Sequence, residues 1–582
     1  MTNLKNVPEW NLSDFYSSTK DKKISLEIKN IEKASTKFAK DFSGKVTKLT
    51  PAQLFTAIET YEKIAENIGK ISSYSYLIYA ADLSNHANIS FYQNISETLS
   101  KFESQLIFFT LELNQVDEKK LKSLELKKYQ PFIRDSRAFK KYQLSNELEK
   151  FSLEKNISGR NAFVRLFDET VNNLKFSYRG KVLSSQEIFN LLSNSDEKVR
   201  KDAAKSIGKT FEENSKTFAF ITNILAKDKA VEDEWRGFES PISSRNLSNF
   251  VEDEVVDLLV NQVKKNYAKI SHRYYKAKAK MLGKKVMNYW DRNAPLSKDE
   301  NKIIPWEEAK NLVLEAYEEF SPEMRKVGEI FFKKNWIDAK VRPGKDSGAF
   351  SHSTVPSVHP YILMNYQGKT RDVMTLAHEL GHGVHQYLAR SQGALMAGTP
   401  LTLAETASVF GEQLTFQKIL KNEKNSEKKK LIIAAKVEDM INTVVRQIAF
   451  LEFETKVHAA RKNGEISLEQ LCKFWMDIQK ESLGSAFKFD DEYRFFWCYI
   501  PHFIHSPFYV YAYAFGDCLV NSLYGIYKSG KVKNFEKKYL EMLAAGGTKH
   551  HKEMLEPFGL SIKDAKFWQA GLDVIIGYID QL

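Results

Sequence analysis

The chain has 582 residues, of which 43% are hydrophobic and 27% are charged. This composition is typical of a folded globular protein and excludes an intrinsically disordered chain, and the length predicts two or three domains. The formal net charge is +12, but the basic residues are scattered along helical stretches and often stand beside glutamates, as in residues 421–430. A nucleic-acid groove needs basic residues gathered on one face, so we expect no nucleic-acid partner.

Helical periodicity dominates the first part of the chain. Residues 1–115 place apolar residues at three- and four-residue intervals, and Thr50-Pro51 supplies a helix-start signal. Further helices over 116–190 are interrupted by "LKFSYRGKVLSS", where two short β-prone runs flank Arg179-Gly180 as in a tight hairpin. We therefore predict an N-terminal helical domain over 1–115, a helical segment with a hairpin over 116–190, and a third domain over 191–582.

A short β-rich region appears around residues 335–366, among long amphipathic helices. The whole pattern predicts a mainly α protein with a small antiparallel sheet just before a histidine-rich helix. Residues 359–366, which include Tyr361, alternate between two faces and could pair with an extended peptide as an added strand. Gly348 and Ala349 could allow close backbone approach at the same edge. A plain core strand fits the pattern as well.

The histidine-rich stretch is "TLAHELGHGVHQYL", which starts at Thr375 and contains H-E-x-x-H at His378, Glu379 and His382. On a helix, positions i and i+4 lie about 40° apart, so the two imidazoles could bind one metal ion. Glu379 could then reach a water on that ion and act as a general base. By chance this motif occurs in roughly one or two chains in a hundred of this composition. The alternative is therefore an ordinary helix whose histidines only form hydrogen bonds within the protein. The apolar flanks of the motif favour the metal site.

A catalytic zinc ion usually has three protein ligands and an open position. The longer motif with a third histidine is excluded, because His385 and Leu388 stand where Gly and His are needed. Between residues 383 and 422 the only acidic residues are Glu405 and Glu412, seven apart and therefore on one helix face. We predict Glu405 as the third ligand and Glu412 as the acceptor for the remaining N–H of a ligand histidine. The alternative is that Glu405 and Glu412 both face solvent. His385 either supports a metal ligand or has only a structural role.

The cysteines and one uncharged segment bear on the compartment. The three cysteines, Cys472, Cys498 and Cys518, are odd in number and widely spaced, which predicts a reducing compartment without disulfides, and the first residues show no secretory signal. Residues 495–516 carry no charged side chain and are long enough to span a bilayer. Their two prolines, two histidines and four tyrosines favour burial inside the protein, so we expect no membrane association.

These residues resemble the oligoendopeptidase F family of zinc peptidases, relatives of thimet oligopeptidase and neurolysin. The likeness rests on "TLAHELGHGVHQYLA", "LAETASVFGE" and "IPHFIHSPFYVYAYAFG", and extends through "WNLSDFY", "GRNAFVRLFDE" and "LAAGGTKHHKEMLEPFGL" over nearly the whole chain. It implies a cytoplasmic, multi-helical clam-shell enzyme, neurolysin-like, with a deep channel for short peptides and a thermolysin-like zinc helix. One Zn²⁺ per chain would be held by His378, His382 and Glu405, with Glu379 as the catalytic glutamate and 191–582 as the catalytic domain.

The resemblance also implies that a histidine and tyrosines of a C-terminal loop bind substrate and stabilise the oxyanion. By position these residues are His502, Tyr511 and Tyr513, with Tyr509 as a further substrate contact. A neutral Tyr or His can donate to a developing oxyanion, and the alternative is that these rings only fill the core. Two positions depart from the expected pattern: Gly411 replaces a polar residue and Asn293 an aromatic one.

The sequence therefore predicts a zinc metallo-endopeptidase whose partners are oligopeptide substrates. Two other functions stay open: trimming of peptide ends, as a peptidyl-dipeptidase or carboxypeptidase would do on the same scaffold, and peptide binding without catalysis. Glu379 argues against the second, because a site that only binds needs ligands but no base.

Overall fold

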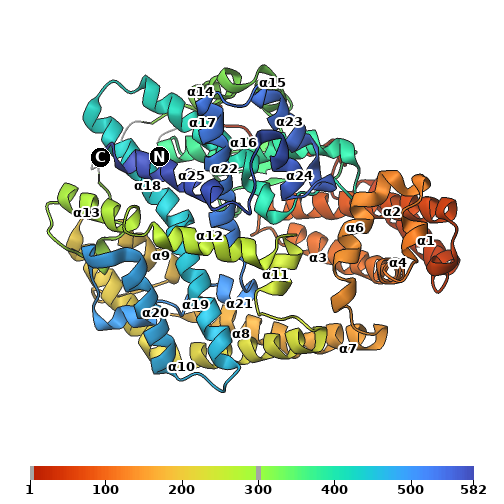
Figure 1. The fold of residues 1–582 in the computed structure, drawn as a ribbon, viewed down its shortest axis with the longest axis horizontal. Coiled ribbons are helices and arrows are strands. Elements are labelled where there is room, and N and C mark those ends of the chain that lie inside the picture. The colour runs from red at the N-terminus through yellow and green to blue at the C-terminus, as the bar shows by residue number, and fades with distance from the viewer. Residues whose placement is uncertain (1–5, 297–302) are drawn as a thin grey trace. The chain divides into compact units, whose positions relative to one another are not determined.

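The computed structural model describes residues 6–296 and 303–582 and confirms a mainly helical chain (Figure 1). The chain folds as two compact units, each assembled from three separate stretches. The first unit contains Met1–Lys141, Asn301–Asn422 and Ile526–Ser561, and the second contains Tyr142–Glu300, Glu423–Gly525 and Ile562–Leu582. The division into three consecutive domains stays a prediction.

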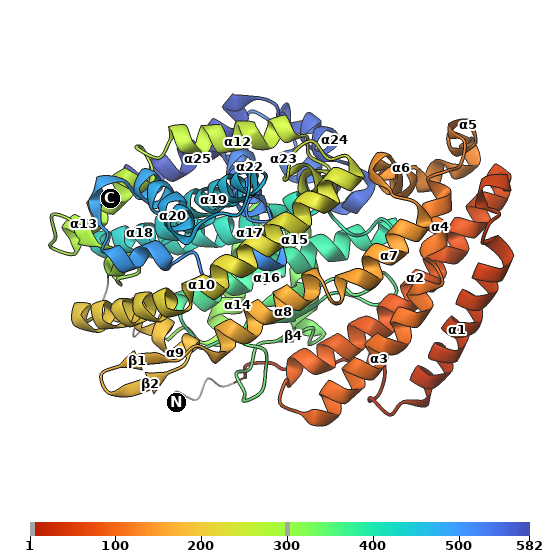
Figure 2. The ribbon, with the colours of Figure 1, turned by 90° about the horizontal axis from the view of Figure 1, so that it is seen from below.

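The helices of the first unit are α1 (Lys22–Phe42), α2 (Pro51–Ala81), α3 (His86–Ser104), α4 (Ile107–Leu113), α5 (Glu118–Leu121), α6 (Gln130–Ala138), α14 (Trp306–Phe320), α15 (Pro322–Lys333), α16 (Thr370–Ala389), α17 (Leu401–Asn422), α23 (Phe535–Ala544) and α24 (His551–Leu555). Figure 2 shows α1, α2 and α3 side by side. The helix start predicted at Thr50-Pro51 is confirmed. The Thr50 side chain accepts the Gln53 N–H at 3.3 Å, and the Gln53 side chain accepts the Thr50 N–H at 2.9 Å.

A three-stranded sheet in the first unit has the order β4 (Ile337–Asp338), β6 (Tyr361–Leu363), β5 (Phe350–His352). β5 pairs antiparallel with β6, as expected, whereas β4 pairs parallel with it, so the sheet is mixed rather than antiparallel throughout. Because β6 is buried and paired on both sides, the prediction that residues 359–366 receive an added strand is wrong. In the described part of the chain β5 pairs with β6 alone and forms the sheet edge.

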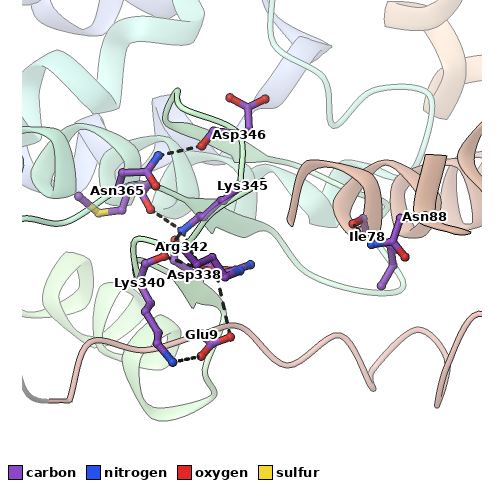
Figure 3. Close-up of polar contacts among 10 residues, drawn as sticks. Glu9, Ile78, Asn88, Asp338, Lys340, Arg342, Lys345, Asp346 and Asn365 are labelled. Atoms are coloured by element: carbon purple, nitrogen blue, oxygen red, sulfur yellow. Dashed lines mark hydrogen bonds and ion pairs between the residues drawn. The ribbon is translucent and has the colours of Figure 1, made fainter. Parts of the chain in front are cut away.

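Lys345 fixes the loop that leads from β4 to β5 (Figure 3). Its side chain is fully buried, and its ammonium donates to the Asp338 carboxylate at 2.8 Å and to the Met364 carbonyl at 2.6 Å. Arg342 also binds Asp338, through two N–H groups at 2.7 and 2.6 Å. The Asn365 amide donates to the Asp346 carbonyl at 2.8 Å. The loop therefore holds β5 in place through buried polar contacts.

The helices of the second unit are α7 (Asn146–Asn156), α8 (Arg160–Asn173), α9 (Ser185–Asn190), α10 (Glu197–Arg236), α11 (Ser243–Ser248), α12 (Asp253–Lys265), α13 (Ser271–Met281), α18 (Ser426–Thr443), α19 (Val445–Arg461), α20 (Leu468–Leu483), α21 (His502–His505), α25 (Ala565–Ile579) and most of α22 (Tyr511–Ser529). β3 (Met287–Asn288) pairs with β7 (Phe487–Lys488). The predicted hairpin is confirmed: β1 (Phe176–Tyr178) and β2 (Lys181–Leu183) are antiparallel, with Arg179 and Gly180 at positive φ (Figure 2).

The uncharged segment 495–516 belongs to the core of the second unit. Most of its side chains are buried, Pro501 stands at the start of α21, and Pro507 lies between α21 and α22. No helix in the described part of the chain is long and apolar enough to cross a membrane. The three cysteines are buried and unpaired.

Candidate metal centre

The histidine motif lies on α16, whose sequence specifies a buried helix. Asp372 caps its start, because its carboxylate accepts the backbone N–H of Gln367 at 2.8 Å and of Lys369 at 3.0 Å. The apolar residues recur every three or four positions and are fully buried: Val373, Leu376, Leu380 and Val384. Helix α17, which carries the two predicted glutamates, packs along α16 (Figure 1).

The three predicted ligands lie together. The Nε2 atoms of His378 and His382 lie 3.4 and 3.5 Å from Oε2 of Glu405, and one ligand atom from each residue falls within 4.8 Å of the others. Ligand atoms around a tetrahedral zinc ion are roughly 3.3 Å apart, given Zn–N and Zn–O distances near 2.0–2.2 Å. The two imidazoles and the carboxylate are also ligand types that zinc accepts. The residues therefore fit a metal ion of this kind.

Two side chains hold the ligands in orientation. Nδ1 of His378 lies 3.4 Å from Oε2 of Glu412, the partner predicted for a ligand histidine. The Ser408 hydroxyl donates to Oε2 of Glu405 at 2.6 Å. Since Glu405, Ser408 and Glu412 lie three, four and seven residues apart on one helix, the periodicity of α17 places them on one face.

Burial governs the electrostatics of this group. It opposes a charge on His378, but Glu412, Glu405 and Glu379 raise the pKa of His378 to about 9. Burial lowers the pKa of His382 and would raise that of Glu405, but the two histidines hold the Glu405 pKa below its ordinary value. Carboxylates thus surround two partly exposed imidazoles, an environment that favours a bound cation.

Glu379 is 6% exposed, and burial raises its pKa to about 7. The backbone N–H of Ser351, on strand β5, lies near this carboxylate and opposes the rise of its pKa. Gln386 fastens this strand to α16, since its amide donates to the Ser351 carbonyl at 3.0 Å and accepts the Ser351 hydroxyl at 2.8 Å. Sequence reasoning missed both Ser351 and Gln386. Gln386 lies seven residues after Glu379 on the same helix face, and that spacing was the available signal.

The other residues of the first unit that were predicted to bind substrate or to support the metal lie in different surroundings. Gly348 and Ala349 are exposed and lead directly into the edge strand β5. Tyr361 is fully buried, and its hydroxyl donates to the Asn11 carbonyl at 2.9 Å, so it is a core residue without a surface for substrate. His385 is buried with Nε2 3.3 Å from the Thr399 hydroxyl, and burial lowers its pKa to about 4. It lies outside the group of three ligand atoms.

The C-terminal loop residues lie in the second unit. Nε2 of His502 is 3.3 Å from the Tyr513 hydroxyl, and the rings of Tyr509 and Tyr513 are 5.3 Å apart. Burial, with a smaller contribution from Arg446, lowers the pKa of His502, so its imidazole is neutral at pH 7. Tyr511, in contrast, is fully buried, and its hydroxyl accepts the Asn249 amide at 2.8 Å. The predicted loop is mostly helical, with His502 in α21 and both Tyr511 and Tyr513 at the start of α22. His502 lies with Tyr509 and Tyr513, while Tyr511 packs into the core.

The chain is similar to proteins of one peptidase family. Residues 190–574 match the model of peptidase family M3, and residues 112–176 match the oligopeptidase F model. The chain is 29% identical to an oligoendopeptidase F homolog of Borreliella burgdorferi over 87% of this chain and 86% of that protein. It is 26% identical to oligopeptidase PepF of Bacillus subtilis over 98% of this chain and 86% of that protein.

The fold is shared with solved structures. A crystal structure of oligoendopeptidase-F from Enterococcus faecium has a TM-score of 0.72 at 21% identity, covering 96% of this chain and 98% of that one. A Chlamydophila abortus protein has a TM-score of 0.83 at 24% identity, covering 98% and 97% of the two chains. The mainly helical fold predicted from the sequence is thus confirmed.

Proposed function

Because the chain belongs to peptidase family M3, we propose that it is a zinc-dependent endopeptidase that cleaves internal bonds of short peptides. The observation that carries the proposal is the placement of Glu379, buried and oriented, beside the group formed by His378, His382 and Glu405. Relatives named oligoendopeptidase F and oligopeptidase PepF support short peptides as the substrate class.

His378, His382 and Glu405 would hold the zinc ion, one per chain. Bound there, zinc would polarise the scissile carbonyl and lower the pKa of a water molecule. Glu379 would act as the general base, accepting a proton from the attacking water and returning it to the leaving amine. The Ser351 N–H near Glu379 favours the charged carboxylate, the form that accepts a proton.

Substrate binding is assigned to two elements. We assign one contact with an extended peptide to the exposed Gly348 and Ala349, which lead into the edge strand β5. Within β5 itself the Ser351 carbonyl is already bound by Gln386. His502 and Tyr513 supply neutral donors for the oxyanion, with Tyr509 as a further contact. The buried, unpaired cysteines support a reducing compartment such as the cytoplasm.

The test is cleavage of a ladder of peptides of increasing length, with and without a chelator, with products mapped by mass spectrometry. Internal cuts that need metal and stop above a length limit are expected. Release of terminal dipeptides alone would instead establish the end-trimming activity. Binding of the peptides without any cleavage would establish the non-catalytic alternative.

Glu379→Gln tests the general base. The variant should keep its zinc content and lose activity by about 10²–10⁴-fold. Glu427→Gln, an exposed change on α18, is the matched control and should retain full activity. A Glu379→Gln enzyme that retains zinc and cleaves at the wild-type rate would refute the assigned role.

A further inference from the structure

The second unit contains a cavity of about 60 Å³ that the proposed chemistry does not use. Its lining brings together elements distant in the sequence, among them Arg292 and Trp290 after β3, Arg446 on α19, and Tyr499 before α21. A buried water needs about 10–15 Å³ by the same measure, so the cavity has room for several waters or for one small ligand.

Several N–H donors in the cavity lining have no partner. The Nε atoms of Arg292 and Arg446 and the indole Nε1 of Trp290 are buried without a hydrogen-bond acceptor. Trp290 is only 6% exposed. A buried donor without an acceptor costs about 1–3 kcal/mol, and more when it is charged. Three such donors around one cavity indicate that an acceptor is missing.

Both guanidinium groups also lack a counter-ion. Among the residues that the structure describes, no carboxylate lies within ion-pair distance of Arg292 or Arg446. The hydrogen bonds of their NH2 atoms go to neutral oxygens, those of Asn442 at 3.1 Å and Tyr499 at 3.0 Å. Both side chains are partly exposed, and an anion in the cavity would compensate their two positive charges.

Nearby carboxylates already have cationic partners. Asp291 is fully buried and binds Arg200 at 2.7 Å and Lys284 at 2.6 Å. Glu492 accepts the Tyr289 hydroxyl at 2.7 Å and pairs with Lys205. The charges of Arg292 and Arg446 therefore remain available to a ligand in the cavity.

We propose that this cavity is an anion site that binds a carboxylate group between Arg292 and Arg446, with the Trp290 indole as a further donor. A planar guanidinium matches the two oxygens of a carboxylate, which it can bind through two parallel N–H groups. Asn293 is exposed and lines the same cavity, so a ligand can enter there. This is the position where the sequence departs from the expected aromatic residue, and a small polar side chain keeps the entrance open.

Formate is the probe for the site. Thermal unfolding is followed while sodium formate replaces sodium HEPES at constant ionic strength. The wild-type Tm should rise with formate and saturate, and Arg446→Gln and Arg292→Gln should abolish the rise. Arg165→Gln, which removes an exposed arginine of α8 paired with Glu169, is the matched control and should keep it. Crystals of the wild-type protein soaked in bromide should show an anomalous peak in the cavity, which tests the site without any variant.

The carboxylate can come from a free small acid or from the end of a peptide. Glu379→Gln enzyme is therefore titrated with one peptide as its free acid and as its C-terminal amide. A preference of tenfold or more for the acid, lost when Arg446→Gln is added, assigns the site to the peptide carboxylate. Equal affinities together with the formate effect assign it to a free acid. This arm rests on the proposed function, whereas the formate and bromide arms do not. No formate effect, no bromide peak and no acid preference would overturn the proposal.

Discussion

The backbone of Gly381 lies directly against the backbone of Ala407, where α16 and α17 pack together. A Cβ atom on Gly381 would lie 2.7 Å from Cα of Ser408 and 2.8 Å from the carbonyl carbon of Ala407, closer than real Cβ contacts. Glycine therefore sets the spacing of the two helices. Because Glu405 stands two residues before Ala407, this spacing also sets the distance from the carboxylate to His378 and His382.

Gly381→Ala should push α17 away from α16 and weaken metal binding. Overpacking of this kind costs about 1–3 kcal/mol, so the Tm should fall together with the zinc content of the purified protein. Gly577→Ala is the matched control, since a Cβ there meets open space on helix α25 and alanine favours a helix by roughly 1 kcal/mol. Zinc affinity in Gly381→Ala equal to that of the control would show that the helix contact does not position the ligands.

Glu412→Gln should weaken zinc binding without removing a ligand. Glutamine has the same size, but its neutral amide is a poorer acceptor for Nδ1–H of His378 than a carboxylate. Loss of such a supporting contact lowers metal affinity by about 10–100-fold. Competition with a chromogenic chelator measures the affinity, with Glu427→Gln as the surface control. A purely structural role for Glu412 would lower the Tm and leave the zinc affinity unchanged.

Tyr513→Phe and Tyr511→Phe should have different effects. Tyr513 contacts His502, and loss of an oxyanion donor lowers kcat by about 10²–10³-fold with little change in Tm. Tyr511 instead binds Asn249 in the core, so its loss should cost about 1–3 kcal/mol of stability and leave kcat unchanged. Steady-state kinetics and thermal unfolding of both variants separate the two roles. Equal kcat in Tyr513→Phe and the wild type would contradict the assignment.

The predictions confirmed by the structure rest on local signals. Thr50-Pro51 starts a helix and Arg179-Gly180 turns a hairpin because a few adjacent residues determine each conformation. The two units were not predicted, since the chain leaves the first unit between Lys141 and Tyr142 and returns near Asn301 without a glycine- or proline-rich linker. Interleaving of this kind depends on contacts between distant segments, which periodicity does not encode.

The same distinction applies to the site. A spacing of four residues places His378 and His382 on one face of α16. A spacing of seven residues places Glu405 and Glu412 on one face of α17, so the sequence could group each pair. The order of the sheet could not be read in this way. Alternation along 359–366 predicts a strand but not its neighbours, and β6 became a central strand with Tyr361 in the core. Only long-range pairing made β5 the edge next to Glu379.

Lys345→Met should destabilise the loop between β4 and β5. It removes a fully buried cation from Asp338 and takes a donor from the carbonyl groups of Asp338, Lys340 and Met364. The Asp338 carbonyl keeps the Met364 N–H and the Lys340 carbonyl keeps Arg342, so the Met364 carbonyl loses most. Breaking a buried ion pair costs about 3–5 kcal/mol, part of which Arg342 offsets by remaining bound to Asp338. Lys340→Met, which removes an exposed pair with Glu9, should cost less than about 1 kcal/mol. Urea unfolding compares the two, and equal losses would contradict the buried role.

Glu454 should make the stability of the second unit depend on pH. Its carboxyl is 2% exposed, accepts the Phe508 N–H at 2.8 Å, and has one oxygen without a partner. Burial raises its pKa from the ordinary 4.5 to about 8, so the folded chain keeps a proton that the unfolded chain loses. The stabilisation by that proton is complete below pH 4.5 and is lost as the pH rises through 8.

Glu454→Gln keeps the acceptor for Phe508 and cannot ionise. The Tm of the wild type, measured relative to this variant, should therefore fall steadily from about pH 5 to about pH 8 and level off above that value. Comparing both proteins in one buffer series cancels the contribution of every other titrating group to the change in Tm. His458 is the nearby example: burial lowers its pKa to about 3, so it stays neutral in the folded protein over this range. A Tm difference that stays constant with pH would show that the folded and unfolded chains bind this proton equally, and would contradict the raised pKa of Glu454.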